Sequence, residues 1–191
     1  MRRVMYVMLA AAAAVALSAT PAHADGFVSP WAGVHFGSDV DNGRGAFGVN
    51  AGYMGAGIIG GELDFGYSPS FFGTQNDFGH NTVIDVMGNL IVGVPIGGTH
   101  GAGFRPFVTG GVGLIRTQID GGTVATVSSS NNEFGWNAGA GAMGYFNQHV
   151  GLRGDVRYFR NFSGDAFNFN FSNNDPGTFH FWRLSAGVVL R

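Results

Sequence analysis

The sequence contains no cysteine and no lysine, and only 12% of its residues are charged. Without cysteine the chain can form no disulfide, thiolate metal site or cysteine nucleophile. All ten basic residues are arginines, and they face twelve acidic residues, so the formal net charge is only −2. Such a near-neutral balance gives no electrostatic basis for binding nucleic acid.

Long apolar runs and helical patterns are also missing after the first 24 residues. No later apolar run is long enough for a membrane helix, and no later segment shows sustained helical periodicity. The chain is instead rich in glycine, with 34 residues, and in aromatic residues, at 14%. Low charge combined with abundant glycine and phenylalanine is typical neither of an ordinary soluble domain nor of a disordered tail.

The N-terminal segment 1–24 has the features of a secretory signal peptide. Arg2 and Arg3 supply the positive start, residues 4–17 the apolar run, and residues 22–24 a small-x-small cleavage site. The apolar run is short for a membrane span. We therefore expect removal of residues 1–24, which leaves one domain over residues 25–191.

The rest of the chain alternates apolar and polar residues with a period of two, which sends successive side chains to opposite faces of a strand. Joints rich in Gly, Asn and Pro interrupt this alternation. We predict eight strands, at residues 27–37, 44–53, 58–67, 81–94, 104–117, 133–146, 150–160 and 178–190.

The segment from Glu133 to Arg160 shows the pattern most clearly, as two strands joined by a short turn. The second of these strands places four large apolar residues on one face and three charged residues on the other: Val150, Leu152, Val156 and Tyr158 against Arg153, Asp155 and Arg157. An arginine on the lipid face at the bilayer midplane would cost about 2–4 kcal/mol. The charged face is therefore expected to line a lumen, and the apolar face to contact lipid.

The strand count and the connections predict a closed barrel. An even count brings both ends of the chain to one side, where the connections are mostly short. The longer connections lie at the opposite rim, at residues 68–80, 118–132 and 161–177. Lipid offers no hydrogen bonds, and closure pairs every strand edge. These features predict an all-β fold, an eight-stranded antiparallel up-and-down transmembrane β-barrel.

Eight strands enclose an interior just wide enough for side chains to fill. Because an unpaired buried charge is costly, the inward-facing charges should form one mutually hydrogen-bonded network. Its predicted members are Glu62, Asp64, Asp85, Arg105, Glu133, Arg153, Asp155, Arg157 and Arg183. Five aromatic residues on the apolar strand faces are candidates for the interface girdles of a membrane barrel, with core-facing or loop positions as the alternative for some of them: Tyr53, Tyr67, Trp136, Tyr158 and Trp182.

Six segments together resemble the OmpA-like outer-membrane β-barrel domain family: GELDFGYSP, NLIVGVP, FRPFVTGGVGL, FGWNAGAGAMGYF, VGLRGDVRYFR and HFWRLSAGVVL. The resemblance covers essentially all of the chain after the signal peptide. It implies a small barrel in the outer membrane of a Gram-negative cell, surrounded by outer-membrane lipid and inserted by the barrel-assembly machinery. We expect a monomer.

The chain departs from the family pattern in two places. We expect no periplasmic peptidoglycan-binding domain after the eighth strand. Many members also end in an aromatic residue that is used in assembly, whereas this chain ends Leu190-Arg191.

Nothing in the sequence predicts catalysis, a cofactor or a metal. The six histidines are scattered, without the spacing of a zinc site. His180 and Ser185 are five residues apart on a strand and so face opposite ways, which argues against a shared catalytic role. The glycine-rich segments GAGAMG and GGVG lack the lysine and the helix of a phosphate loop.

We therefore expect a structural or surface-interaction barrel whose charge network fills the lumen. Two alternatives stay open. One is a narrow channel for ions or small solutes, gated by the network. The other is a secreted soluble barrel that binds a small apolar ligand, which would need an apolar lumen and a polar exterior. Any surface ligand of a membrane barrel would bind the long loops.

Overall fold

The computed structural model describes residues 24–37, 40, 43–69, 71, 80–97, 101–120, 129–162 and 180–191. Its strands are β1 (Ala24–Phe36), β2 (Arg44–Gly55), β3 (Ile59–Pro69), β4 (His80–Gly93), β5 (Gly103–Asp120), β6 (Ser129–Tyr145), β7 (Val150–Asn161) and β8 (His180–Leu190). The predicted signal peptide lies outside the described residues except for Ala24, the first residue of β1. Within the described part, no helix is long and apolar enough to cross a membrane.

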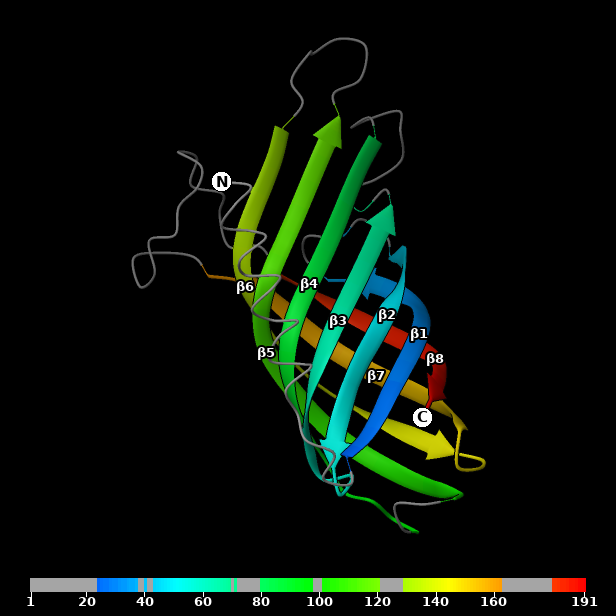
Figure 1. Cartoon of the computed structure of the whole chain (residues 1–191). Coiled ribbons are helices and arrows are strands. Elements are labelled where there is room, and N and C mark those ends of the chain that lie inside the picture. The colour runs from blue at the N-terminus through cyan, green and yellow to red at the C-terminus, as the bar shows by residue number, and fades with distance from the viewer. Residues whose placement is uncertain are drawn as a thin grey trace.

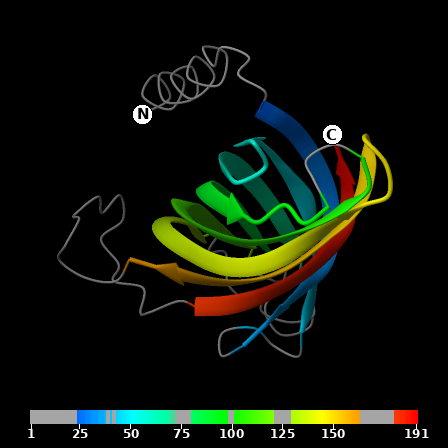
Figure 2. The same ribbon diagram turned by 90° about the horizontal axis from the view of Figure 1, so that it is seen from below.

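The eight strands form one closed antiparallel barrel, as predicted (Figures 1 and 2). Each strand pairs with the next along the chain, and β8 pairs back with β1. At this seam Val28 lies opposite Leu190, and Phe36 lies opposite Trp182. Closure therefore leaves neither β1 nor β8 as an open edge, which is the condition for a sheet to lie in lipid.

The strand boundaries follow the alternation to within a few residues, and the largest differences are at β1, which begins at Ala24 instead of residue 27, and at β5 and β6. β5 was predicted to end at Thr117 and β6 to begin at Glu133, but β5 extends to Asp120 and β6 begins at Ser129, which pairs with Ile119. Thr117 pairs with Asn131, and residues beyond them pair as well. Backbone hydrogen bonds need no apolar pattern, so a ladder can continue through polar residues that the alternation does not mark.

Side-chain exposure alternates along the strands, as predicted for a barrel with its apolar face toward lipid and its charged face toward the lumen. On β7, inward-facing residues are buried and outward-facing residues are mostly exposed. The outward residues Leu63 and Leu184 are 57% and 53% exposed, whereas inward Arg157 and Arg183 are both 0% exposed. The barrel thus has an apolar outside and a charged inside, the reverse of a soluble ligand-binding barrel.

Candidate functional site in the barrel lumen

The lumen is built in layers, and β8 shows them in order. Its inward-facing residues run from Phe181 through Arg183, Ser185 and Gly187 to Val189. Phe181 belongs to an apolar cluster near the long-connection rim, and Val189 belongs to another near the short turns. Charged and polar side chains therefore occupy the middle of the lumen, with apolar side chains above and below them.

The middle layer contains seven of the nine charged residues that were predicted to share a network. We call them the charge belt: Glu62, Asp64, Asp85, Arg153, Asp155, Arg157 and Arg183. Each of these seven residues is at most 5% exposed. Three arginines thus face four carboxylates in a space shielded from water.

Arg157 lies at the centre of the charge belt and contacts three carboxylates. Its Nη2 lies 2.8 Å from Glu62 Oε1, and its Nη1 lies 3.3 Å from Asp64 Oδ2. Its Nε donates a hydrogen bond of 2.9 Å to Asp155 Oδ1. All the nitrogen atoms of this guanidinium group are therefore used, which is the arrangement in which a buried charge is tolerated.

Arg153 and Arg183 extend the charge belt on either side of Arg157. Arg153 pairs with Glu62 at 2.6 Å and with Asp155 at 3.0 Å. Arg183 pairs with Asp64 and, at 3.1 Å, with Asp85. Glu62, Asp64 and Asp155 are each shared between two arginines, so these ion pairs form one connected network rather than separate bridges.

Aromatic rings cover the two flanking guanidinium groups. The Arg183 guanidinium carbon lies 4.2 Å from the ring centroid of Trp31 and 4.8 Å from that of Phe159. The corresponding carbon of Arg153 lies 4.7 Å from the centroid of Phe107. Such cation–π contacts, strongest where water is excluded, hold the arginines in place without using their hydrogen-bond donors.

The charge belt joins opposite walls of the barrel. Glu62 and Asp64 come from β3, whereas Arg153 and Arg157 come from β7, four strands away in a closed ring of eight. Asn89 of β4 adds a hydrogen bond of 3.4 Å to Glu62. The ion pairs therefore cross the lumen instead of running along one wall.

Two clusters of buried apolar residues lie in the lumen, one on each side of the charge belt. We call them the short-turn cluster and the long-loop cluster, after the rim that each lies nearer. The short-turn cluster consists of Phe27, Met54, Ile91, Phe107, Met143, Tyr145 and Val189. The long-loop cluster consists of Val40, Phe71, Val83, Met87, Ile115, Phe159 and Phe181. The sequence prediction missed both clusters, although strand parity places all their members inside except Val40 and Phe71, which lie in connections between strands.

Two predicted members of the network take other positions. Arg105 faces the lumen and is 2% exposed, but it pairs with Asp25 at 3.6 Å near the short-turn rim. Glu133 is partly exposed, and it accepts a hydrogen bond of 2.8 Å from Asn161 toward the opposite rim. The sequence predicted correctly that both residues lie on the inner face of the barrel. The face on which a residue lies does not determine its height along the barrel axis.

Glycines on the inner face make room for the charge belt. A Cβ atom added at Gly66 would lie 2.2 Å from Asp85 Oδ2, and one added at Gly139 would lie 2.7 Å from Arg157 Cγ. Both distances are far shorter than a van der Waals contact. The expectation that small inner residues leave space for long polar neighbours therefore holds at these positions.

The five aromatic residues predicted to face outward do so, at two heights. Tyr53 lies near the short turns, two residues before the end of β2. Trp136, Tyr158 and Trp182 lie side by side on β6, β7 and β8, with ring centroids 5.6 Å and 5.0 Å apart along the series. Tyr67 contacts Phe47 near the long-connection rim, at a centroid distance of 5.2 Å.

The chemistry available in the lumen is ion pairing and packing. Among the described residues, no group of three or more His, Asp or Glu side chains has the arrangement of a metal site. His180 faces outward on β8, whereas Ser185 faces inward and donates a hydrogen bond of 3.2 Å to Asp155. These two residues therefore lie on opposite sides of the barrel wall.

A closed antiparallel barrel with an apolar outside and a packed, charged inside is a transmembrane barrel of the outer-membrane type. The family model of the outer membrane protein beta-barrel domain matches residues 9–189, and the chain belongs to this family. The protein is accordingly a protein of the outer membrane.

Solved structures with the same fold include three outer-membrane barrels. Neisserial surface protein A (NspA) is 16% identical, with a TM-score of 0.63 over 87% of this chain and 97% of that one. The N-terminal barrel of Pseudomonas aeruginosa OprF is 16% identical, with a TM-score of 0.52 over 87% and 98%. The attachment invasion locus protein Ail of Yersinia pestis, in complex with the heparin analogue sucrose octasulfate, is 14% identical, with a TM-score of 0.51 over 87% and 97%. No curated protein is similar enough in sequence to match the chain.

Proposed function

We propose that this protein is a non-catalytic barrel with a closed lumen, which serves as a structural component of the outer membrane and presents its long loops to a surface ligand. The observation that carries the proposal is the layered lumen. The charge belt links opposite walls, and an apolar cluster lies on each side of it. A barrel filled in this way is a rigid support rather than a conduit.

The burial of the central arginines supports the closed state. Arg157 and Arg183 are both 0% exposed, and so are Phe159 and Phe181 directly above them in the long-loop cluster. An ion moving through the lumen would have to displace both the aromatic rings and the ion pairs. Each apolar cluster is a barrier of its own, because an ion in an apolar layer loses its hydration without compensation.

A narrow channel is the second candidate, favoured by the charges that line the middle of the lumen. In that case the Arg157–Glu62 pair would act as the gate. The two proposals differ in a measurable way. A gate made of one ion pair opens when the pair is removed, whereas a lumen that is also closed by two apolar clusters stays shut.

Conductance in planar bilayers tests the proposal. We expect no discrete conductance steps from the wild type, and none from Glu62→Ala or Arg157→Ala. Heat-modifiable gel migration verifies that each variant is folded. A variant that also truncates both apolar clusters serves as the positive control, with Phe159→Ala and Phe181→Ala in the long-loop cluster and Met54→Ala and Phe107→Ala in the short-turn cluster. Discrete steps from the wild type, or from either single variant, would establish the channel instead.

Several further features belong to the same proposal. We take residues 1–24 to be a cleaved signal peptide, the cell to be Gram-negative, insertion to occur through the barrel-assembly machinery, and the barrel to be a monomer. The surface ligand is expected at the connections 68–80, 118–132 and 161–177, which largely lie outside the described residues. The placement of His180 and Ser185 on opposite sides of the wall supports the absence of catalysis.

A further inference from the structure

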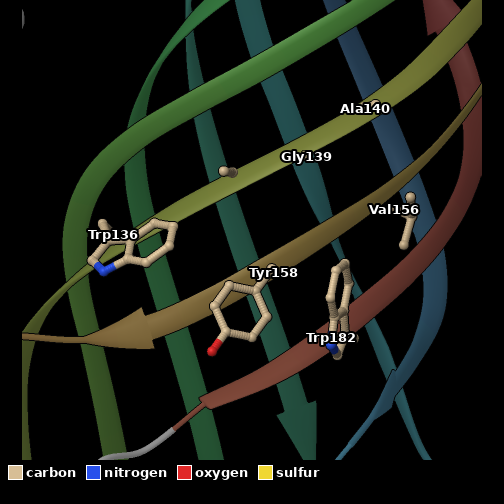
Figure 3. Close-up of a pocket in the computed structure, with 7 residues that line it drawn as sticks. Trp136, Gly139, Ala140, Val156, Tyr158 and Trp182 are labelled. Atoms are coloured by element: carbon tan, nitrogen blue, oxygen red, sulfur yellow. The ribbon is translucent and has the colours of Figure 1, made fainter.

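The outer face of β6, β7 and β8 carries a shallow apolar hollow just below the long-connection rim (Figure 3). We call it the aromatic groove. Its lining is Trp136, Ala138, Gly139, Ala140, Val156, Tyr158 and Trp182. The three large rings and Val156 form the sides of the groove, and the small residues of β6 form its floor. The hollow exists because these small residues lie next to outward positions that carry bulky side chains.

An ordinary aromatic girdle explains the presence of tryptophan and tyrosine at this height, but it does not explain the hollow. The Tyr158 ring contacts Trp136 on one side and Trp182 on the other, and the three rings bound the floor on the side of the long connections. A hollow with an apolar floor and apolar sides fits a hydrocarbon chain.

One charged residue lies directly above the aromatic groove. Arg160 is exposed on the outer face of β7, two residues beyond Tyr158, which is about 7 Å along a strand. In the strand pairing, Arg160 lies opposite Trp136 of β6 on one side and opposite His180 of β8 on the other. Arginine side chains near a membrane surface extend toward the headgroups and keep their aliphatic stem against apolar neighbours. The guanidinium group is thus placed at headgroup height, beside the hollow that is shaped for a chain.

From this combination we propose that the aromatic groove and Arg160 bind one anionic membrane lipid with a phosphate headgroup. One acyl chain lies over Ala138 and Ala140 between the rings, and the phosphate pairs with Arg160. The charge of Arg160 decides the class of lipid, because a planar guanidinium binds phosphate oxygens with two parallel hydrogen bonds. A zwitterionic lipid can fill the groove but gains less from the arginine.

The positions of the three tryptophans make this proposal directly measurable. Trp136 and Trp182 line the groove, whereas Trp31 is 6% exposed and stacked on Arg183 inside the lumen. The barrel is reconstituted in phosphatidylcholine vesicles in which about a fifth of the lipid has brominated acyl chains, either as phosphatidylglycerol or as phosphatidylcholine. Bromine atoms quench tryptophan fluorescence only at close contact.

We expect the wild type to prefer brominated phosphatidylglycerol about fivefold over brominated phosphatidylcholine in relative binding, the preference that one arginine contributes near an anionic lipid. Arg160→Gln should abolish this preference, and Arg160→Lys should retain part of it. Arg116→Gln is the matched control, because Arg116 is also exposed on the outer face toward the same rim but lies on β5, away from the groove. A Trp136→Phe/Trp182→Phe variant should show little quenching by either lipid.

Equal quenching of the wild type by the two lipids would overturn the proposal. So would a preference that survives in Arg160→Gln, or one that is lost equally in Arg116→Gln, since both results indicate general surface charge. A wild type that is unquenched by either lipid and is crosslinked as a dimer would show that a second copy covers the groove instead. Heat-modifiable migration of each variant excludes misfolding as the cause.

Discussion

Glu62 and Arg157 are 95 residues apart in the chain, yet their side chains meet at 2.8 Å across the lumen. β3 supplies the carboxylate and β7 supplies the guanidinium, from opposite walls of the barrel. Both side chains are fully shielded from water. Substitution of either residue therefore tests how much the cross-lumen contacts contribute to the stability of the barrel.

Replacing Glu62 by Gln is expected to destabilise the barrel strongly. The change leaves Arg153 and Arg157 with one carboxylate fewer in a buried site, and breaking a buried pair on one side costs about 3–5 kcal/mol. The urea midpoint of unfolding, followed by tryptophan fluorescence in vesicles, measures the loss. Arg116→Gln on the outer face should change the midpoint little, and equal midpoints for the two variants would contradict a stabilising charge belt.

Arg183→Lys should destabilise the barrel although it keeps the positive charge. The guanidinium group of Arg183 pairs with Asp64 and Asp85 through two different nitrogens and lies between two aromatic rings. A lysine ammonium is a point charge that cannot reproduce this fork or the stacking. We expect a loss of about 1–3 kcal/mol in the free energy of unfolding. The control is Arg116→Lys at an exposed position on β5, and a comparable loss there would show that the fork is unimportant.

Gly139→Ala should impair folding where Gly144→Ala does not. Both glycines lie on β6, but a Cβ atom at Gly139 would collide with the Val156 carbonyl oxygen and lie 2.7 Å from Arg157 Cγ, whereas one at Gly144 would have no heavy atom within 4 Å. Overpacking of this kind costs about 1–3 kcal/mol. The fraction of heat-modifiable protein after refolding into vesicles compares the two variants. If both refold equally well, the space beside Arg157 is not limiting.

An arginine in place of Leu63 should cost far more than one in place of Phe36. Leu63 is 57% exposed on the outer face, midway along β3, whereas Phe36 ends β1 at the long-connection rim. Arginine costs about 2–4 kcal/mol at the bilayer midplane and about 0–1 kcal/mol near the interface. Unfolding free energies in vesicles give the two values. A penalty of the same size at both positions would place the barrel differently in the membrane.

The sequence was sufficient to predict the strands and the face of each residue, because period-two alternation determines both. It predicted that Arg105 and Glu133 face inward, but not that they lie at opposite rims. Height in a barrel depends on strand tilt and on the register between strands, and neither can be read from one strand alone. Phe159 and Phe181 were overlooked for another reason. The prediction assigned polar residues to the inside and apolar residues to the outside, and these two apolar residues lie on the inner face among the charges.

The carboxylates of β3 and the arginines of β7 and β8 enter the barrel at different stages of the chain. Glu62 pairs only with arginines of β7, whereas Asp64 gains its second arginine, Arg183, from β8, the strand that closes the ring by pairing with β1. Until β7 and β8 are in place, Glu62, Asp64 and Asp85 lack the arginines that pair with them in the complete barrel, although Asp155 already has Arg153 and Arg157 beside it on β7. The last strand therefore completes the ring and also supplies the last arginine of the charge belt, and a barrel that lacks it has both an open edge and carboxylates with too few partners, which makes it ill-suited to remain in lipid.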